Sequence, residues 1–205
     1  MIGILDMNMG NLRSVTNAVY SLGYDPKVIH DQEGLKEASH LIIPGVGAYP
    51  AAMRQLEAMN LKDAIKDFAS TKRPVLGICL GMHIFSTSGE EGGGAEGLGL
   101  VPGEVLRIDT QPGLVVPHVG WNNIRFLKEH PVLEKVKDGV DFYFVHSYRY
   151  VCEDQQDAFG ETEYGDAWPS VVAKDNVIGF QFHPEKSQIN GLKLIENFCE
   201  WDGKC

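Results

Sequence analysis

Short apolar runs alternate with segments of helical periodicity through the first half of the chain. Strands are predicted at 2–6, 26–30, 40–43 and 74–78. A first helix is predicted between Asn11 and Gly23, a residue typical of helix C-termini, because apolar side chains recur there at helical spacing, at Leu12, Val15, Val19 and Leu22. Further helices are predicted at 51–59 and 61–69, the latter capped by Asn60. This alternation is typical of helices that cross over between parallel strands.

Beyond residue 100 the apolar runs become shorter and predict strands at 104–108, 119–126, 141–152, 158–163, 170–174 and 177–182, followed by a helix at 188–200. The chain has no long linker and no fixed repeat, so we expect one domain over 1–205. The fold class predicted is α/β, with a mixed sheet. The glycine-rich segment 89–99 is predicted to be a flexible loop, because its three glutamates argue against phosphate binding.

Composition narrows the class of protein further. Hydrophobic residues make up 43% and charged residues 22%, which predicts neither disorder nor a membrane span. The N-terminal segment 1–6 lacks the features of a signal peptide, so the cytoplasm is the expected compartment. The four cysteines predict neither a disulfide framework nor a zinc site, and Cys152, Cys199 and Cys205 have no assignable role. The net charge of −10 disfavours nucleic acid as a partner.

Cys79 is the first candidate for chemistry. It follows the apolar run Val75-Leu76-Gly77-Ile78 and precedes the segment 80–85, which can be helical. A sharp turn between strand and helix requires small residues on both sides, and Gly77 and Gly81 supply them. A cysteine at a helix start also has its thiolate stabilised by unpaired N–H groups. Gly-x-Cys-x-Gly therefore predicts a nucleophile, although a lone cysteine is usually just a buried small side chain.

A thiolate nucleophile needs a histidine that moves protons and an acceptor that orients the histidine. His183 ends the predicted strand 177–182, at the sheet edge where the Cys79 turn lies. Glu185 follows across Pro184, whose fixed φ stiffens the turn. Cys79, His183 and Glu185 are therefore the predicted catalytic triad.

The tetrahedral intermediate of acyl transfer also needs N–H donors for its oxyanion. The predicted strand 40–43 runs into Gly45-Val46-Gly47, which frees the backbone there, and Leu80 follows the nucleophile directly. The oxyanion donors are therefore predicted from Gly45, Val46 and Leu80. A plain turn is an equally good interpretation of the glycine pair alone.

Five segments combine into a pattern of fixed order and spacing over nearly the whole chain. They are Pro44-Gly45-Val46-Gly47, Gly77-Ile78-Cys79-Leu80-Gly81-Met82, Pro117-His118-Val119-Gly120-Trp121-Asn122, Phe144-Val145-His146-Ser147-Tyr148 and Gly179-Phe180-Gln181-Phe182-His183-Pro184-Glu185-Lys186-Ser187. The pattern closely resembles the glutaminase subunits of imidazole glycerol phosphate synthase, a branch of the class I amidotransferases. The Gly-x-Cys-x-Gly turn around Cys79 and His-Pro-Glu are common to the whole class, whereas the other segments point to this branch.

The resemblance implies a flavodoxin-like fold with a mainly parallel central sheet flanked by helices. It implies hydrolysis of L-glutamine to glutamate and ammonia through a thioester on Cys79, without metal or cofactor. In this family the ammonia passes to a partner cyclase, a (β/α)8 barrel in a heterodimer, which forms imidazole glycerol phosphate and AICAR in histidine biosynthesis. The implied glutamine-binding residues are Gly47, His83, Glu91, His146, Ser147 and Tyr148. The implied partner-facing residues are Asn11, His118, Trp121, Asn122, Tyr143 and Lys186.

Two departures from the family pattern leave alternatives open. His83 stands where the family usually has Gln, and Met7-Asn8-Met9 replaces an aromatic-Gly pattern. A paralogous glutaminase that serves acetamidino-sugar formation is one alternative. A catalytically idle scaffold that binds a partner is another, and a stand-alone cysteine hydrolase is a third.

Overall fold

The computed structural model describes residues 1–205 and is built around an eight-stranded sheet with the order β2-β1-β3-β4-β14-β13-β12-β9. Neighbouring strands are parallel from β2 to β14 and antiparallel from β14 to β9. The bounds are β1 (Ile2–Leu5), β2 (Pro26–Ile29), β3 (His40–Gly45), β4 (Val75–Cys79), β9 (Arg125–Phe126), β12 (Ala158–Tyr164), β13 (Asp166–Lys174) and β14 (Val177–Phe180). The four strands predicted in the first half are all present.

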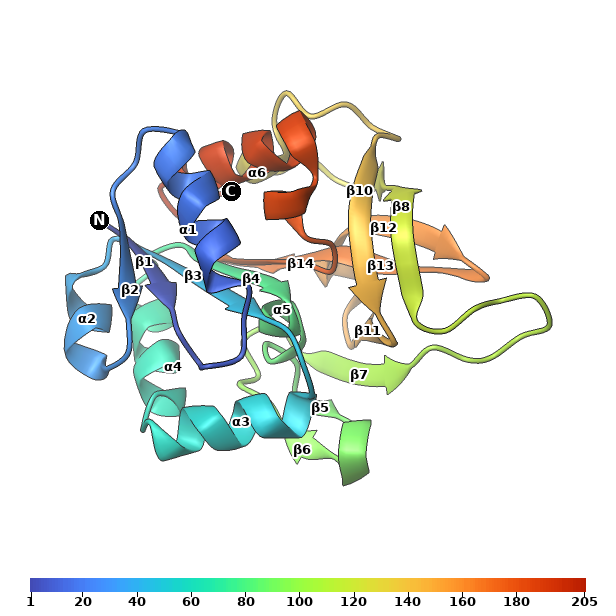
Figure 1. Ribbon diagram of the computed structural model, residues 1–205, viewed down its shortest axis with the longest axis horizontal. Coiled ribbons are helices and arrows are strands. Elements are labelled where there is room, and N and C mark those ends of the chain that lie inside the picture. Colours follow the sequence, from blue (N-terminus) through green and yellow to red (C-terminus); the bar gives the residue numbers. More distant parts are fainter.

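Helices cover both faces of this sheet (Figure 1). α1 (Leu12–Ser21) and α6 (Gln188–Glu200) lie on one face, and α3 (Tyr49–Ala58), α4 (Lys62–Ser70) and α5 (Leu80–His83) lie on the other. Alternate residues of β3 serve the two layers: Leu41 and Ile43 belong to the core on the α3–α4 side, and Ile42 to the core on the α1–α6 side. A strand buried on both faces must be apolar throughout, which explains the continuous run at 41–43.

Two small sheets extend the fold beyond β14 (Figure 1). β10 (Asp141–His146) pairs with β8 (His118–Asn123), and β11 (Tyr148–Cys152) pairs with β7 (Gly103–Arg107), which continues into β5 (Ser88–Gly89) and β6 (Ala95–Glu96). The prediction of one strand over 141–152 is wrong, because the chain leaves one sheet and enters the other at Ser147. The predicted strand 119–126 is likewise divided at Ile124.

Other differences from prediction are local. α2 (Gln32–Glu37) was not predicted, and its start is fixed by the Asp31 carboxylate, which accepts the Gly34 N–H at 2.9 Å. The N-cap of α4 is Leu61 rather than Asn60, whose φ of 55° is left-handed. The segment 89–99 is more regular than a flexible loop, because it contains part of β5, the 3-10 turn Glu91–Gly93 and β6. Three more 3-10 turns span Pro131–Leu133, Gln155–Asp157 and Pro184–Lys186.

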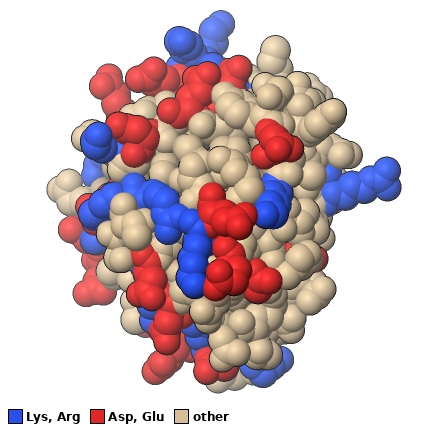
Figure 2. Space-filling view, turned by 90° about the vertical axis from the view of Figure 1, so that its left-hand side faces the viewer, with Lys and Arg blue, Asp and Glu red and all other residues tan.

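The charged side chains on the face around α2 are of mixed sign (Figure 2). Lys27 pairs with Glu37 at 2.8 Å, and Lys36 pairs with Glu33 at 2.6 Å. Exposed pairs of this kind contribute little to stability, so they describe the surface rather than hold the fold. None of the helices has both the length and the apolar character that spanning a lipid bilayer requires.

Candidate active site

Cys79 ends β4 and lies on a strained turn before α5. Its φ of 55° and ψ of −109° fall outside the regions that a non-glycine residue prefers. Glycines make the turn possible: a Cβ on Gly77 would lie 2.4 Å from the carbonyl oxygen of Gly81, and one on Gly81 would lie 1.7 Å from that of Ile43. The strand and the helix therefore pass each other at a distance that only glycine allows, as the spacing of Gly77 and Gly81 predicts.

His183 and Glu185 form a buried pair. Nδ1 of His183 lies 2.9 Å from Oε1 of Glu185, and their side chains are 2% and 1% exposed. The His183 N–H donates to the carbonyl of Tyr143 at 2.9 Å, which ties this backbone to β10. The Ser187 hydroxyl, just before α6, donates to the carbonyl of His183 at 2.6 Å. Two atoms of the pair, Nε2 of His183 and Oε2 of Glu185, are buried without a hydrogen-bond partner.

The pKa of His183 reflects these neighbours. Burial by itself lowers this pKa, but the interactions with Cys79 and Glu185 outweigh it and raise the pKa to about 9. The raised pKa favours the protonated imidazole, in which Nδ1 faces Glu185 and Nε2 lies on the opposite side of the ring. The structure thus brings Cys79, His183 and Glu185 together.

Gln181 is a neighbour of Cys79 that sequence reasoning missed. Its amide Nε2 lies 4.0 Å from the Cys79 sulfur, and its Oε1 accepts a hydrogen bond of 2.7 Å from Nε2 of His83. Burial lowers the pKa of His83 to about 4, so this ring is neutral. Gln181 is fully buried, and in the sequence it is a polar residue within an otherwise apolar run. That polar residue was the available signal of a functional contact.

The expected oxyanion donors are only partly in place. Leu80 opens α5 directly after Cys79, and Gly45 lies opposite Cys79 in the β3–β4 register. The Val46 N–H, however, donates to the carbonyl of Met9 at 3.0 Å. It is therefore not free for an oxyanion in this conformation, contrary to the simplest expectation.

Five of the six residues expected to bind glutamine fall into two groups, and the sixth, His83, is buried with its Nε2 bonded to Gln181. Glu91 approaches the segment that carries Gly47, because its Oε2 accepts the Tyr49 N–H at 2.7 Å at the start of α3. His146, Ser147 and Tyr148 cross from β10 to β11, next to Val145, whose carbonyl lies 3.9 Å from the Cys79 sulfur. Neither ring nitrogen of His146 is free to bind glutamine, because both are within hydrogen-bond distance of protein atoms. The His146 side chain therefore does not fit the direct contact that we expected.

Comparison with known proteins identifies the family. A family model described as glutamine amidotransferase class-I matches residues 3–201. The chain belongs to the class I glutamine amidotransferase family. The imidazole glycerol phosphate synthase subunit HisH of Sulfurimonas denitrificans is 48% identical over 98% of both chains. The subunit of the same name from Aquifex aeolicus is 45% identical over 95% of this chain and 94% of its own. The resemblance inferred from the five sequence segments is confirmed.

Solved structures of other amidotransferases share the fold. PurLQS from Thermotoga maritima aligns with a TM-score of 0.76 and 18% identity, and covers 97% of both chains. A structure described as a glutamine amidotransferase aligns with a TM-score of 0.74 and 19% identity, again over 97% of both chains. The predicted α/β amidotransferase fold, with helices on both faces of a mainly parallel sheet, is confirmed.

The residues expected to face a partner of this amidotransferase do not share one side of the molecule. Trp121 is 49% exposed and packs edge-on against Tyr143, and Lys186 lies over the Tyr143 ring at 5.7 Å. His118 is buried on the opposite side of β8, together with the partly buried Asn122. Asn11 points inward, because its Nδ2 donates to Oε1 of Glu185 at 3.4 Å. The outward group is therefore Trp121, Tyr143 and Lys186.

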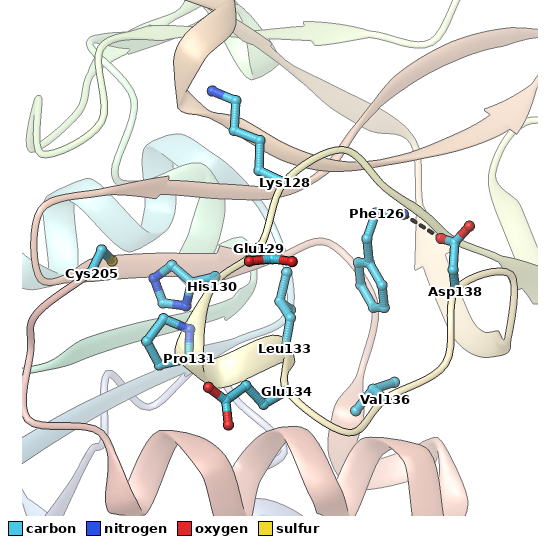
Figure 3. Close-up of a pocket in the computed structure, with 10 residues that line it drawn as sticks. All are labelled: Phe126, Lys128, Glu129, His130, Pro131, Leu133, Glu134, Val136, Asp138 and Cys205. Carbon is cyan, nitrogen blue, oxygen red and sulfur yellow. Dashed lines mark hydrogen bonds between the residues drawn. The ribbon is translucent and has the colours of Figure 1, made fainter.

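A cavity of about 580 Å³ lies away from the amidotransferase site, between the 126–138 segment and the C-terminal Cys205 (Figure 3). Phe126 and Leu133 contribute apolar walls, and His130 and Cys205 also line the cavity. None of the residues expected around Cys79 lines this cavity. No group of three or more His, Cys, Asp or Glu side chains is placed to hold a metal ion.

Proposed function

We propose that this chain is the glutaminase subunit of an imidazole glycerol phosphate synthase, with Cys79 as nucleophile. The observation that carries the proposal is the buried His183–Glu185 pair beside a cysteine on a strained strand-helix turn. The curated relatives are HisH subunits at 40–48% identity over nearly the whole chain, which favours histidine biosynthesis over the surface-sugar alternative.

The first half of the reaction forms a thioester. Cys79 attacks the carboxamide carbon of glutamine as a thiolate, its proton being carried on Nε2 of His183, and the carbonyl oxygen takes up the negative charge in a tetrahedral intermediate. His183 then donates its Nε2 proton to the nitrogen, the C–N bond breaks, and ammonia leaves. Glu185 accepts the Nδ1–H of His183 throughout, so it holds the ring in one orientation and stabilises its positive charge.

The second half releases glutamate. His183, now neutral, takes a proton from water, and the oxygen attacks the thioester carbon. The C–S bond breaks, so that the Cys79 thiolate and protonated His183 are regenerated, and the new carboxyl group loses its proton to solvent as glutamate leaves. Leu80 N–H, together with an N–H from Gly45 or Val46, stabilises the oxyanion in both halves.

The partner proposed here is a (β/α)8-barrel cyclase that covers the outward group on β8 and β10. Ammonia reacts as the neutral amine, and water at neutral pH protonates it, so a sealed interface between the subunits protects the product. Exposed Val119 and Trp121 offer apolar area for such an interface, at 55% and 49% exposure. All four cysteines are free, which fits the reducing cytoplasm.

The test is glutamine hydrolysis by the purified chain, alone and with its cognate cyclase and the cyclase's ribotide ligand. Hydrolysis is expected to rise sharply in the complex and to disappear in Cys79→Ala. Cys205→Ala, which changes an exposed thiol, serves as the matched control and should keep the stimulated rate. A Cys79→Ala complex with undiminished hydrolysis would exclude the proposed mechanism. Turnover of esters or peptides by the chain alone would favour a stand-alone hydrolase.

A further inference from the structure

Two histidines on facing strands form a chain of hydrogen bonds that the proposed mechanism does not use. His118 of β8 and His146 of β10 are directly opposite each other in the antiparallel register. Nδ1 of His118 lies 3.0 Å from Nε2 of His146, and Nδ1 of His146 lies 2.7 Å from the carbonyl oxygen of Tyr148. At the other end, Nδ2 of Asn122 lies 3.4 Å from Nε2 of His118. We call this chain, from Asn122 to the Tyr148 carbonyl, the imidazole relay.

Only one arrangement of protons satisfies the relay. A carbonyl oxygen can only accept, so the proton of His146 is on Nδ1 and its Nε2 must accept. His118 therefore donates from its own Nδ1, which leaves its Nε2 to accept from the Asn122 amide. The orientation of that amide is independently fixed, because Nδ2 also donates to the carbonyl of Glu163 at 3.0 Å and Oδ1 accepts the Asn123 N–H at 2.9 Å.

A positive charge on either ring would place two N–H groups face to face. The surroundings oppose such a charge, because burial lowers the pKa of His118 to about 4 and that of His146 to about 3. Both rings are therefore neutral at pH 7 and share the same Nδ1–H tautomer.

The His118 ring is also held mechanically. It stacks on Tyr164 with ring centroids 3.9 Å apart and on Phe144 at 4.8 Å. Flat contacts on two aromatic rings leave the ring little freedom to turn, so its Nδ1–H points at His146 without further adjustment.

The relay ends at the backbone beside the nucleophile. Val145, whose carbonyl lies 3.9 Å from the Cys79 sulfur, immediately precedes His146. Between His146 and Tyr148 the chain leaves one sheet for the other at Ser147. The carbonyl of Ser147 accepts the Ile108 N–H at 3.0 Å, and the His146 ring also spans the crossing, by donating to the Tyr148 carbonyl.

We infer that His118 is a positioning residue, which holds the His146 ring and through it the 146–148 crossing, next to the Val145 carbonyl that lies 3.9 Å from the Cys79 sulfur. The inference rests on the proposed glutaminase activity, and on the expectation from the family resemblance that Ser147 and Tyr148 bind glutamine. His118 touches neither the substrate nor the reacting atoms. Its loss therefore affects how glutamine is held more than how the thiol reacts.

The first test is the tautomer of each ring in the wild-type chain, read from ¹⁵N and ¹³C NMR shifts of labelled histidine at pH 7. Both His118 and His146 should be neutral and protonated on Nδ1. A ring protonated on Nε2, or charged at this pH, would overturn the relay. This measurement needs no variant and does not depend on catalytic activity.

The second test separates the hydrogen bond from the stacking at His118. His118→Phe keeps a flat ring between Tyr164 and Phe144 but has no donor, whereas His118→Asn keeps a donor near the Nδ1 position and loses the ring. With the partner-stimulated enzyme, we expect KM for glutamine to rise about tenfold in His118→Phe and to stay within about threefold in His118→Asn.

Other outcomes of the second test are equally informative. A structural role alone would lower thermal stability and kcat together and leave KM unchanged. The opposite order, with His118→Phe normal and His118→Asn impaired, would show that the stacking matters and not the relay. If His118→Phe does not fold, the wild-type tautomers decide. If the wild-type complex fails to hydrolyse glutamine, the proposed function is wrong, while the tautomers still report on the relay.

Discussion

The backbone N–H of Val46 donates a hydrogen bond of 3.0 Å to the carbonyl oxygen of Met9. For Val46 to stabilise an oxyanion, this bond must break and the peptide must turn towards Cys79. We predict that the cyclase and its ligand release the Val46 amide, so that its hydrogen exchange accelerates about tenfold or more. The Leu41 N–H of β3, the strand that ends just before Val46, donates to the carbonyl of Pro74 at 2.9 Å, and it is the control that should not change. Unchanged protection at Val46 would leave the second oxyanion donor to Gly45.

Glu185→Gln tests the orientation of the catalytic imidazole. The amide can donate to Nδ1 of His183 and favour the wrong tautomer, and it removes the charge that stabilises the imidazolium. We expect the stimulated kcat to fall about 100-fold or more, with a smaller change in KM. Glu161→Gln, at an exposed ion pair with Arg125, is the control and should have no effect. A Glu185→Gln enzyme with normal kcat would remove Glu185 from the triad.

Gly81→Ala tests the close approach at the elbow. Its Cβ would lie 1.7 Å from the carbonyl oxygen of Ile43, a backbone atom that cannot move aside without shifting β3. We expect a loss of about 3 kcal/mol or more in the free energy of unfolding, or failure to fold. Gly34→Ala, inside α2, would meet side-chain atoms rather than backbone, the nearest being Cγ2 of Ile29 at 3.1 Å, and should cost much less. Denaturant unfolding of both variants makes the comparison, and equal losses would contradict this account.

The acid side of the stability profile follows from four buried histidines. Burial lowers the pKa of His83, His118 and His130 to about 4 and that of His146 to about 3, from an ordinary value of 6.5. Each ring stays neutral in the folded chain, and below pH 6.5 it takes up a proton when the chain unfolds. Its contribution to the free energy of unfolding is therefore fully present above pH 6.5 and is lost as the pH falls towards these values. Each contributes a slope of about 1.4 kcal/mol per pH unit in that window.

His130→Asn isolates one of these protons outside the site. Nδ1 of His130 accepts the Val132 N–H at 3.1 Å, and the Asn side-chain oxygen can accept the same bond without titrating. The slope of the free energy of unfolding against pH, between about pH 6 and 5, should become shallower by about 1.4 kcal/mol per pH unit, the contribution of one proton. Denaturant titrations across this range measure the slope. An unchanged slope would mean that His130 is not the neutral buried group described here.

His183 has the opposite effect on stability: its contribution is lost when the pH rises rather than when it falls. Its pKa is raised to about 9, so its stabilising contribution is fully present below pH 6.5 and is lost as the pH rises through about 9. Cys79→Ala removes one of the interactions that raise this pKa. The NMR titration midpoint of His183 should therefore move down in Cys79→Ala, and a midpoint that stays in place would show that the sulfur and the ring do not interact.

Local patterns were sufficient for the parts of the fold that depend on local physics. The glycines at 77 and 81 predicted the turn at Cys79, because only a tight strand-helix crossing requires glycine at both positions. The helix at 188–200 was predicted with its observed bounds, because its apolar spacing is regular. α2 was missed because it is short and contains Gly34, and only its Asp31 cap marks it.

What escaped prediction depends on pairing between distant segments. Nothing in the run 141–152 indicates that the strand changes sheets at Ser147, since its partners in β7 and β8 are distant in sequence. His118 lies opposite His146 because β8 pairs with β10, and Gln181 contacts His83 across a longer stretch of sequence. Both contacts depend on how distant segments pair. The Val46–Met9 bond is likewise a contact between two loops, so the occupied oxyanion donor had no sequence signal.

The central claim is that the sulfur of Cys79 is the nucleophile that attacks glutamine. The most direct measurement is mass spectrometry after treatment of the cyclase-bound chain with 6-diazo-5-oxo-L-norleucine, a glutamine analogue that alkylates such a nucleophile. We predict one adduct, on the peptide that carries Cys79, with loss of glutaminase activity in proportion to labelling. Labelling only at exposed Cys205, or an unlabelled Cys79 in an active complex, would contradict the account.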